Sequence, residues 1–287
     1  MIRAAFSTLA CPEWKLDRIA SSAAALGFDG VELRTFGFGS TRSACDPAMT
    51  DPAKTRAIFA REGVRIACLA TSVRLDQPIR PKIFGRTFLF DQERQVREAR
   101  RLIDLAGAIG APLMRIYGFE VGPGETRASA TRLILARLAM VLDHARNRRV
   151  RVVLENGGSY ARAAELKGLI DAGRHQLLGA AYALAPGVAA GDSPQEAVRT
   201  LGADLELARV KDLDDRGRPV PLGQGRTPVA EFAAALGKTG FGGWVVYEWD
   251  RAWDEALAVP DAVLPGVAEW LYQWTSPSAA PPAAAMA

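Results

Sequence analysis

The segment Gly243-Trp-Val-Val-Tyr-Glu-Trp-Asp250 combines aromatic and β-branched residues, which is the composition of a β-strand. The turn sequence Gly240-Phe-Gly-Gly243 comes directly before it and marks where the strand begins. A strand that is apolar on both faces is typical of a parallel sheet covered by helices. This strand nevertheless ends with Glu248, between two aromatic residues. Because a buried carboxylate needs a partner, Glu248 is expected either to form an ion pair or to stand at the mouth of a site.

Seven more segments of strand composition precede this one, and a segment of helical composition follows each of the eight. The predicted strands are Ala4–Leu9, Gly30–Arg34, Arg65–Thr71, Leu113–Gly118, Arg151–Asn156, Leu177–Ala185, Leu205–Asp212 and Trp244–Trp249. The predicted helices are Leu16–Leu26, Pro52–Glu62, Gln92–Ile109, Arg127–Arg148, Ala161–Ala172, Ser193–Leu201, Val229–Lys238 and Ala262–Trp274.

This regular alternation of strands and helices predicts an α/β protein with a parallel sheet. Eight units in 287 residues fit a single (β/α)8 TIM barrel better than a doubly wound sheet. A Rossmann fold is disfavoured because no G-x-G-x-x-G sequence follows the first strand. We therefore expect one barrel domain over residues 1–275, followed by a disordered Pro/Ala-rich tail over 276–287.

The composition excludes several other classes of protein. The net charge is +4, and no basic block alternates with aromatic residues, so a nucleic-acid partner is not indicated. No apolar run is long enough to span a membrane, and no signal peptide is recognisable at the start. The three cysteines, Cys11, Cys45 and Cys68, lack metal-ligand spacing and are expected to be reduced thiols in a cytoplasmic protein.

The chemistry of a (β/α)8 barrel lies at the carboxyl ends of its strands. Here Glu155 ends the fifth predicted strand and Glu248 ends the eighth, while Arg209 and Lys211 share one face of the seventh. If these faces point into the barrel, two carboxylates and two cations meet above its core.

With these strand ends in place, the sequence resembles the xylose isomerase-like superfamily of sugar phosphate isomerases and epimerases. Seven segments carry the resemblance, in the family's order and over nearly the whole chain. They are Phe6-Ser-Thr-Leu-Ala-Cys-Pro-Glu-Trp14, Gly27-Phe-Asp-Gly-Val-Glu-Leu-Arg34, Cys68-Leu-Ala-Thr-Ser-Val-Arg74, Leu154-Glu-Asn156, Val210-Lys-Asp212, Pro221-Leu-Gly-Gln-Gly225 and Tyr247-Glu-Trp-Asp250.

The resemblance implies a divalent metal, commonly Mn2+, held by a Glu, an Asp, a His and a second Glu at the ends of strands five to eight. The two Glu positions match Glu155 and Glu248, but the Asp position is Ala183 and the His position is Arg209. Two carboxylates beside a permanent cation are a poor Mn2+ site. We therefore expect no cofactor, and a divalent metal only if Glu155 and Glu248 suffice to hold it.

The resemblance, together with these residues, implies an isomerase or epimerase of a sugar or sugar-like carbonyl compound, in carbohydrate metabolism. Glu155 and Glu248 would move a proton through an enediolate that Arg209 stabilises in place of the metal. Lyase or dehydratase activity in specialised metabolism remains an alternative, as does a non-catalytic barrel that binds a ligand. A further alternative is that the two carboxylates are a structural remnant, held by Arg209.

Six residues are predicted to contact the substrate, with structural roles open for each: Arg34, Arg74, Asn156, Tyr182, Lys211 and Trp249. For Lys211 an ion pair at the strand end is an equal alternative. The expected partner is a small-molecule substrate, without nucleic acid or membrane, and a homo-oligomer is possible.

Overall fold

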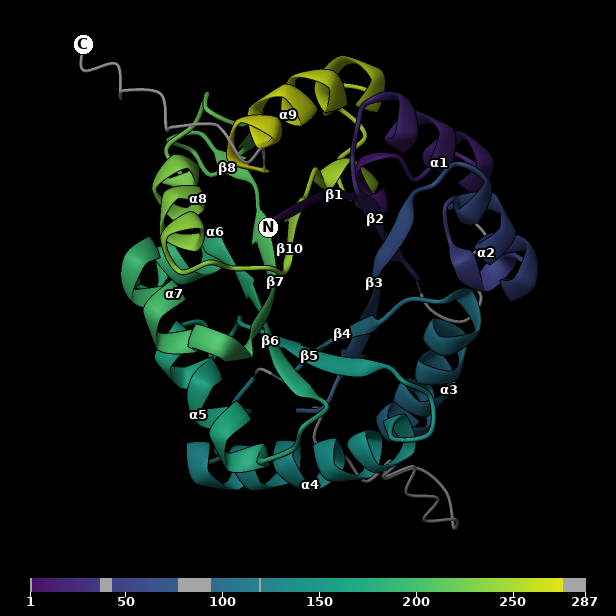
Figure 1. The fold of residues 1–287 in the computed structure, drawn as a ribbon. Coiled ribbons are helices and arrows are strands. Elements are labelled where there is room, and N and C mark those ends of the chain that lie inside the picture. The colour runs from purple at the N-terminus through teal and green to yellow at the C-terminus, as the bar shows by residue number, and fades with distance from the viewer. Residues whose placement is uncertain (1, 37–42, 77–93, 119, 276–287) are drawn as a thin grey trace.

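Eight parallel strands close into one barrel in the computed structural model, which describes residues 2–36, 43–76, 94–118 and 120–275 (Figure 1). The strands are β1 (Arg3–Ser7), β2 (Gly30–Arg34), β3 (Arg65–Arg74), β4 (Leu113–Tyr117), β5 (Arg151–Glu155), β6 (Leu178–Ala183), β7 (Leu205–Val210) and β10 (Trp244–Tyr247). Because β1 pairs with both β2 and β10, the sheet is closed. The predicted single (β/α)8 TIM barrel is confirmed.

Helices surround the strands as an outer ring (Figure 1). They are α1 (Leu16–Ala25), α2 (Pro52–Arg61), α3 (Arg94–Ile109), α4 (Arg127–Ala145), α5 (Ala163–Gly173), α6 (Leu184–Ala189), α7 (Pro194–Leu201), α8 (Val229–Lys238) and α9 (Pro260–Thr275). Local chemistry fixes several helix starts. Asp51 and Ser193 cap the backbone N–H groups of α2 and α7, and a proline occupies the first helical position of both.

Six predicted strands end one or two residues earlier than expected, and local structure explains three of these ends. The first stops at Ser7, whose hydroxyl accepts from the backbone of Leu9 and starts the 3-10 turn η1 (Thr8–Ala10). The sixth stops at Ala183 because α6 begins at the next residue. The seventh stops at Val210, and residues beyond it form the hairpin of β8 (Asp212–Leu213) and β9 (Pro219–Val220). A short additional helix and a hairpin therefore rim the strand ends of the barrel.

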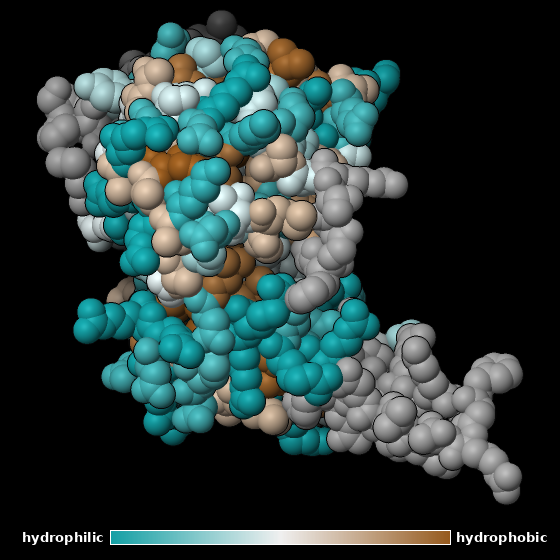
Figure 2. Space-filling view, turned by 90° about the vertical axis from the view of Figure 1, so that its right-hand side faces the viewer, coloured by the Kyte–Doolittle hydropathy of each residue, from teal (hydrophilic) through white to brown (hydrophobic). Residues whose placement is uncertain are grey.

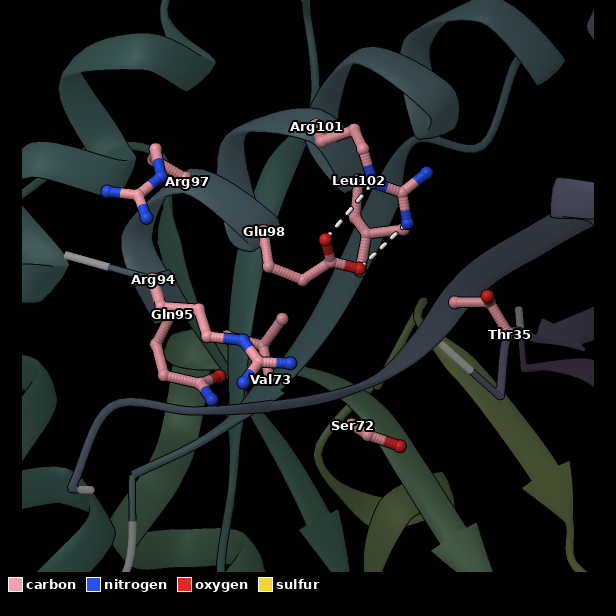
Figure 3. A pocket seen from close by; sticks show the side chains of 9 residues that line it. All are labelled: Thr35, Ser72, Val73, Arg94, Gln95, Arg97, Glu98, Arg101 and Leu102. Atoms are coloured by element: carbon pink, nitrogen blue, oxygen red, sulfur yellow. Dashed lines mark hydrogen bonds and ion pairs between the residues drawn. The ribbon is translucent and has the colours of Figure 1, made fainter. Parts of the chain in front are cut away.

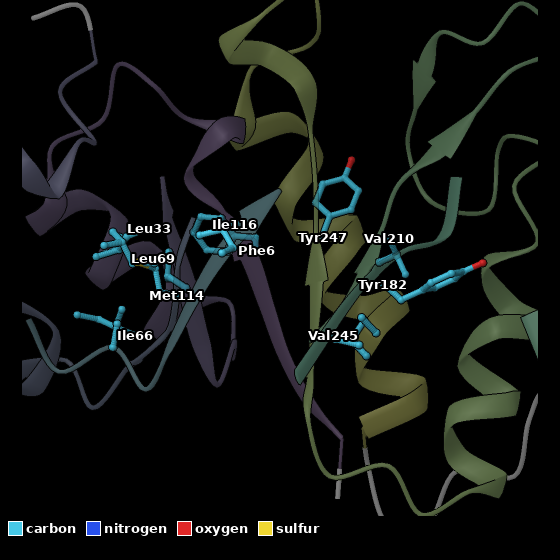
Figure 4. Packing of buried hydrophobic residues seen from close by; sticks show 14 of the residues in the cluster. Phe6, Leu33, Ile66, Leu69, Met114, Ile116, Tyr182, Val210, Val245 and Tyr247 are labelled. Atoms are coloured by element: carbon cyan, nitrogen blue, oxygen red, sulfur yellow. The ribbon is translucent and has the colours of Figure 1, made fainter. Parts of the chain in front are cut away.

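Side chains of each strand alternate between the helix layer and the barrel interior. The outward-facing residues pack under the helices, as Figure 4 shows for Phe6, Leu33, Met114 and Val245. The inward-facing apolar residues form a separate cluster: Ala5, Ala67, Cys68, Leu113, Val153, Ala181, Leu207, Trp244 and Val246. Small and large residues fill the interior together, so the barrel is packed below its functional end.

The outer surface over the helices is mostly hydrophilic. On the face shown in Figure 2, hydrophilic residues separate the apolar patches from one another. All three cysteines are buried and unpaired. Within the described part of the chain, the helices are too short or too polar to cross a bilayer. The tail expected over 276–287 lies outside the described residues.

Candidate functional site

Four charged side chains form a buried layer inside the barrel, above the apolar interior. Glu32 and Arg115 are 0% exposed, Arg209 is 2% exposed and Glu155 is 5% exposed. They come from β2, β4, β7 and β5, at inward positions of the strand alternation. Two carboxylates and two guanidiniums cancel in charge, which is the condition under which charged groups tolerate burial.

Arg209 is the centre of this layer. Its Nη1 donates to both carboxylate oxygens of Glu155, at 3.0 and 2.8 Å. Its Nη2 donates to Glu32 Oε1 at 3.1 Å and lies 3.3 Å from Glu248 Oε1. Burial lowers the pKa of Arg209, but the three carboxylates outweigh burial and raise it well above its usual value. Arg209 is therefore a permanent cation that three carboxylates share.

Arg115 holds Glu155 from the other side. Its Nη1 donates to Glu155 Oε2 at 2.8 Å, and its Nε lies 3.8 Å from Glu32 Oε2, beyond hydrogen-bond distance. The guanidinium also lies over the ring of Tyr117, 4.6 Å from its centre. Within the described residues, Nε and Nη2 of Arg115, Nε of Arg209 and Oε2 of Glu32 have no hydrogen-bond partner. These groups can still bind water or a ligand.

Glu248 stands at the mouth of the barrel, directly after β10. Its side chain is 12% exposed and lies near both Arg209 and Lys211, whose Nζ is 3.8 Å from Glu248 Oε2. Burial alone raises the pKa of Glu248, but Arg209 and Lys211 outweigh it and lower the pKa to about 2. Lys211 donates to Asp250 at 2.8 Å. Glu248 is therefore an ionised carboxylate at neutral pH, close to solvent.

Glu248 is expected to stabilise the fold at neutral pH and to lose this contribution as the pH falls from 4.5 towards 2. Its pKa in the folded protein lies below its ordinary value, so acid favours the unfolded state, which binds the proton more readily. Urea unfolding between neutral pH and about pH 3 should show a steeper loss of stability in wild type than in Glu248→Gln. Parallel curves would contradict the expectation.

Arg34 lies beside this group, at the end of β2. Its side chain is buried, and it donates to the backbone oxygen of Thr71 and to the hydroxyl of Ser72, both at 2.5 Å. Arg74, at the end of β3, instead forms an ion pair with Asp76 at 2.6 Å, with a side chain 41% exposed. The structure therefore brings Arg34 to the charged group and leaves Arg74 outside it.

Three other predicted contact residues have structural partners away from the charged group. Asn156 donates to the backbone oxygens of Ala161 and Ala183 and accepts from the backbone N–H of Ala183, the last residue of β6. Tyr182 faces outward from β6, packs on Phe232 and donates to Asp192 at 3.0 Å. Trp249 is buried in the outer core and donates to the backbone oxygen of Ala258.

The outward position of Tyr182 follows from the strand alternation. The inward neighbours of Tyr182 are Ala181 and Ala183, and its hydroxyl lies against the backbone of Gly187, where any side chain would collide with it.

Sequence reasoning missed Glu32 and left Arg115 without a role. The signal was nevertheless present, because each charged residue stands between two apolar residues of a strand. Val31-Glu32-Leu33 and Met114-Arg115-Ile116 both place the charge on the face opposite to the apolar pair. In a strand buried on both faces, such a charge must have a partner inside the barrel.

Comparison with known proteins places the chain in a family. The sequence of residues 20–274 matches the family model described as xylose isomerase-like TIM barrel. The chain belongs to the xylose isomerase-like TIM-barrel family. No curated protein matches the sequence.

Several solved structures share the family fold at low sequence identity. A D-psicose 3-epimerase crystallised with D-fructose is 14% identical, with a TM-score of 0.74 over 95% of this chain and 99% of its own. An L-ribulose 3-epimerase is 16% identical, with a TM-score of 0.77 over 96% and 94%. The probable 3-DHS dehydratase AsbF from Bacillus anthracis is 14% identical, with a TM-score of 0.74 over 94% and 98%. Sugar epimerases and a dehydratase are thus among the structural neighbours.

The divalent metal that the resemblance implies does not fit the residues present. Arg209 contacts both Glu155 and Glu248, so a permanent cation already lies where these carboxylates would hold the metal. Ala183, at the position of a further ligand, offers only a methyl group. Within the described residues, no group of three or more His, Cys, Asp or Glu side chains is arranged to hold a metal ion.

Proposed function

We propose that this protein is an isomerase or epimerase of a sugar or sugar-like carbonyl compound and works without a divalent metal. The observation that carries the proposal is that Arg209 contacts Glu155 and Glu248 at the same end of the barrel. A fixed cation next to a carboxylate at the barrel mouth is suited to reactions that develop negative charge on a substrate oxygen.

Glu248 takes the proton from the carbon next to the substrate carbonyl, and the electron pair of that C–H bond moves into an enediolate. N–H groups of Arg209 and Arg115 stabilise the negative oxygen of this enediolate, and several of them lack a protein partner within the described residues. For an isomerisation, Glu248 returns this proton to the neighbouring carbon of the enediolate. An epimerisation needs a proton donor on the opposite face, which is Glu155 after it has taken up a proton from solvent, and the proton left on Glu248 then returns to solvent. Glu155 also holds the guanidiniums in place.

Substrate binding strengthens Glu248 as a base. In the free protein Arg209 and Lys211 lower its pKa to about 2, against the effect of burial. A substrate oxygen that inserts between Arg209 and Glu248 weakens this attraction and excludes water, and both changes raise the pKa. The carboxylate thus becomes a better proton acceptor when the substrate is present.

The experiment that tests the proposal is deuterium exchange into ketoses by the wild-type protein, dialysed against EDTA. D-fructose, D-psicose, D-tagatose and L-ribulose are incubated in D2O and analysed by NMR and mass spectrometry. We expect deuterium at a carbon next to the carbonyl, at a rate that added Mn2+ does not raise.

Three results would count against this proposal. Exchange that requires Mn2+ would restore the ordinary metal-dependent mechanism. Loss of water from the ketose would favour a dehydratase, since the same enediolate can expel a β-hydroxyl. Absence of any exchange would favour a ligand-binding barrel.

A further inference from the structure

Arg34 is a buried cation whose hydrogen-bond partners in the described residues are all neutral. The residue is 6% exposed, and its two Nη atoms donate to the backbone oxygen of Thr71 and the hydroxyl of Ser72. Its Nε has no hydrogen-bond partner there, and no described carboxylate lies within ion-pair distance. Arg34 thus differs from Arg115 and Arg209, which each contact carboxylates.

A buried cation without a counter-charge is unfavourable. Burial lowers the pKa of Arg34, and the neighbouring cations Arg115 and Arg209 lower it further. A negative group beside Arg34 would relieve both effects. This part of the site is therefore suited to an anion.

Two aromatic rings flank the guanidinium. The ring centres of Phe36 and Trp253 each lie 5.9 Å from Arg34 Cζ and 5.7 Å from one another. Trp253 is 60% exposed and follows η4 (Asp250–Ala252), just after Glu248. The wall formed by Phe36 and Trp253 thus links the end of β2 to the strand end that carries the proposed base.

The surroundings of Ser72 add further positive charge. Thr35 and Ser72 line a cavity of about 360 Å³ opposite the side chains of α3 (Figure 3). Three of these side chains are arginines and one is a glutamate: Arg94, Arg97, Arg101 and Glu98. The glutamate pairs with Arg101 at 2.7 Å. Among the described residues that line this cavity, arginines therefore outnumber carboxylates.

We propose that Arg34 binds an anionic substituent of the substrate, a carboxylate or a phosphate, at the end of the molecule remote from the carbon that Glu248 deprotonates. The anion accepts a hydrogen bond from Nε of Arg34, and the Phe36–Trp253 wall shields it from water. This inference rests on the proposed function and narrows its substrate class to anionic polyhydroxy carbonyl compounds.

Three ketoses that share carbons 1 to 5 test this inference. Calorimetry compares the binding of D-fructose, D-fructose 6-phosphate and D-fructuronate. These compounds differ at carbon 6, which is a primary alcohol, a phosphate ester or a carboxylate. We expect at least one anionic ketose to bind wild type about 10- to 100-fold more tightly than D-fructose, the range of one charge-assisted hydrogen bond. The tighter of the two anions identifies the substituent.

Two variants assign the preference to Arg34. Arg34→Gln keeps hydrogen-bonding capacity without charge and should lose the preference, whereas Arg34→Lys should keep part of it. Arg74→Gln is the matched control, because Arg74 also ends a strand but already pairs with Asp76. The Arg74→Gln protein should prefer the anionic ketose as strongly as wild type does.

Equal binding of all three ketoses by wild type would overturn the inference, and so would the absence of measurable binding or a preference that persists in Arg34→Gln. Thermal unfolding of each variant shows whether it folds. If Arg34→Gln does not fold, Arg34→Lys serves as the test instead: its preference for the anionic ketose over D-fructose should be lost at high salt. Deuterium exchange, measured for the neutral and the anionic ketoses alike, reports on the proposed function, whereas calorimetry reports on the anion site, so the two can fail independently.

Discussion

Glu248→Gln is expected to slow deuterium exchange into a ketose by a factor of about 10² to 10⁴, the range that a positioned general base contributes. Glutamine has nearly the shape of glutamate and can keep an oxygen beside Arg209, but it cannot take a proton at neutral pH. Glu248 is the most exposed of the three carboxylates that contact Arg209, so neither Glu32 nor Glu155 can replace it without a change of position.

Asp250→Asn is the matched control for this experiment. Asp250 also lies at the mouth and pairs with Lys211 at 2.8 Å, but no contact with Arg209 is found for it. Its replacement removes one negative charge from the same region and should slow exchange far less than Glu248→Gln does. A Glu248→Gln protein that keeps a rate within about threefold of wild type would contradict the assigned base.

Arg209→Met is expected to lower the free energy of unfolding by about 3 to 5 kcal/mol, the usual effect of removing one partner of a buried ion pair. Methionine fills much of the same volume, so the loss is mainly electrostatic. It leaves Glu155 with Arg115 alone and Glu32 without a hydrogen-bonded cation among the described residues. Equilibrium urea unfolding measures the change.

A surface variant and a double variant separate charge from packing in this experiment. Arg18→Met removes an ion pair with Asp261 whose side chains are 53% and 60% exposed, and it should change stability by at most about 1 kcal/mol. Glu32→Gln combined with Arg209→Met should recover part of the lost stability, because Glu32 is the carboxylate that Arg209→Met leaves without a hydrogen-bonded cation among the described residues. If Arg209→Met costs no more than Arg18→Met, Arg209 does not hold the charged layer together.

The alternation of strand and helix segments was sufficient to predict the barrel. Eight apolar runs spaced by helical segments have few compatible arrangements, since parallel strands need crossover helices and the barrel buries both faces of each strand. The predicted ends were less accurate where loop chemistry decided them. The strand predicted over 177–185 ends at Ala183 because α6 begins at Leu184, and local composition does not separate these two conformations.

The sequence also placed Glu155, Arg209, Lys211 and Glu248 at one end of the barrel, and the structure brings them together. Each follows from the rule that inward positions at strand ends converge. The rule did not select Glu32, because the sequence of its strand does not show which residue pairs with it. The partner, Arg209, lies 177 residues away in sequence. Nor did it exclude Tyr182, which a small change in the strand alternation would have turned inward.

The sequence by itself determined the fold and the residues whose charge must be accommodated inside it. Both follow from the spacing of apolar and charged residues within each strand and helix, which is a local property of the chain. Tertiary structure alone decided how the charges are paired. Closure of the barrel sets Arg209 between Glu32 of β2, Glu155 of β5 and Glu248 just after β10, and it leaves Arg34 with neutral partners in the described residues. Electrostatic interactions depend on distances through space, and residues far apart in the chain set those distances.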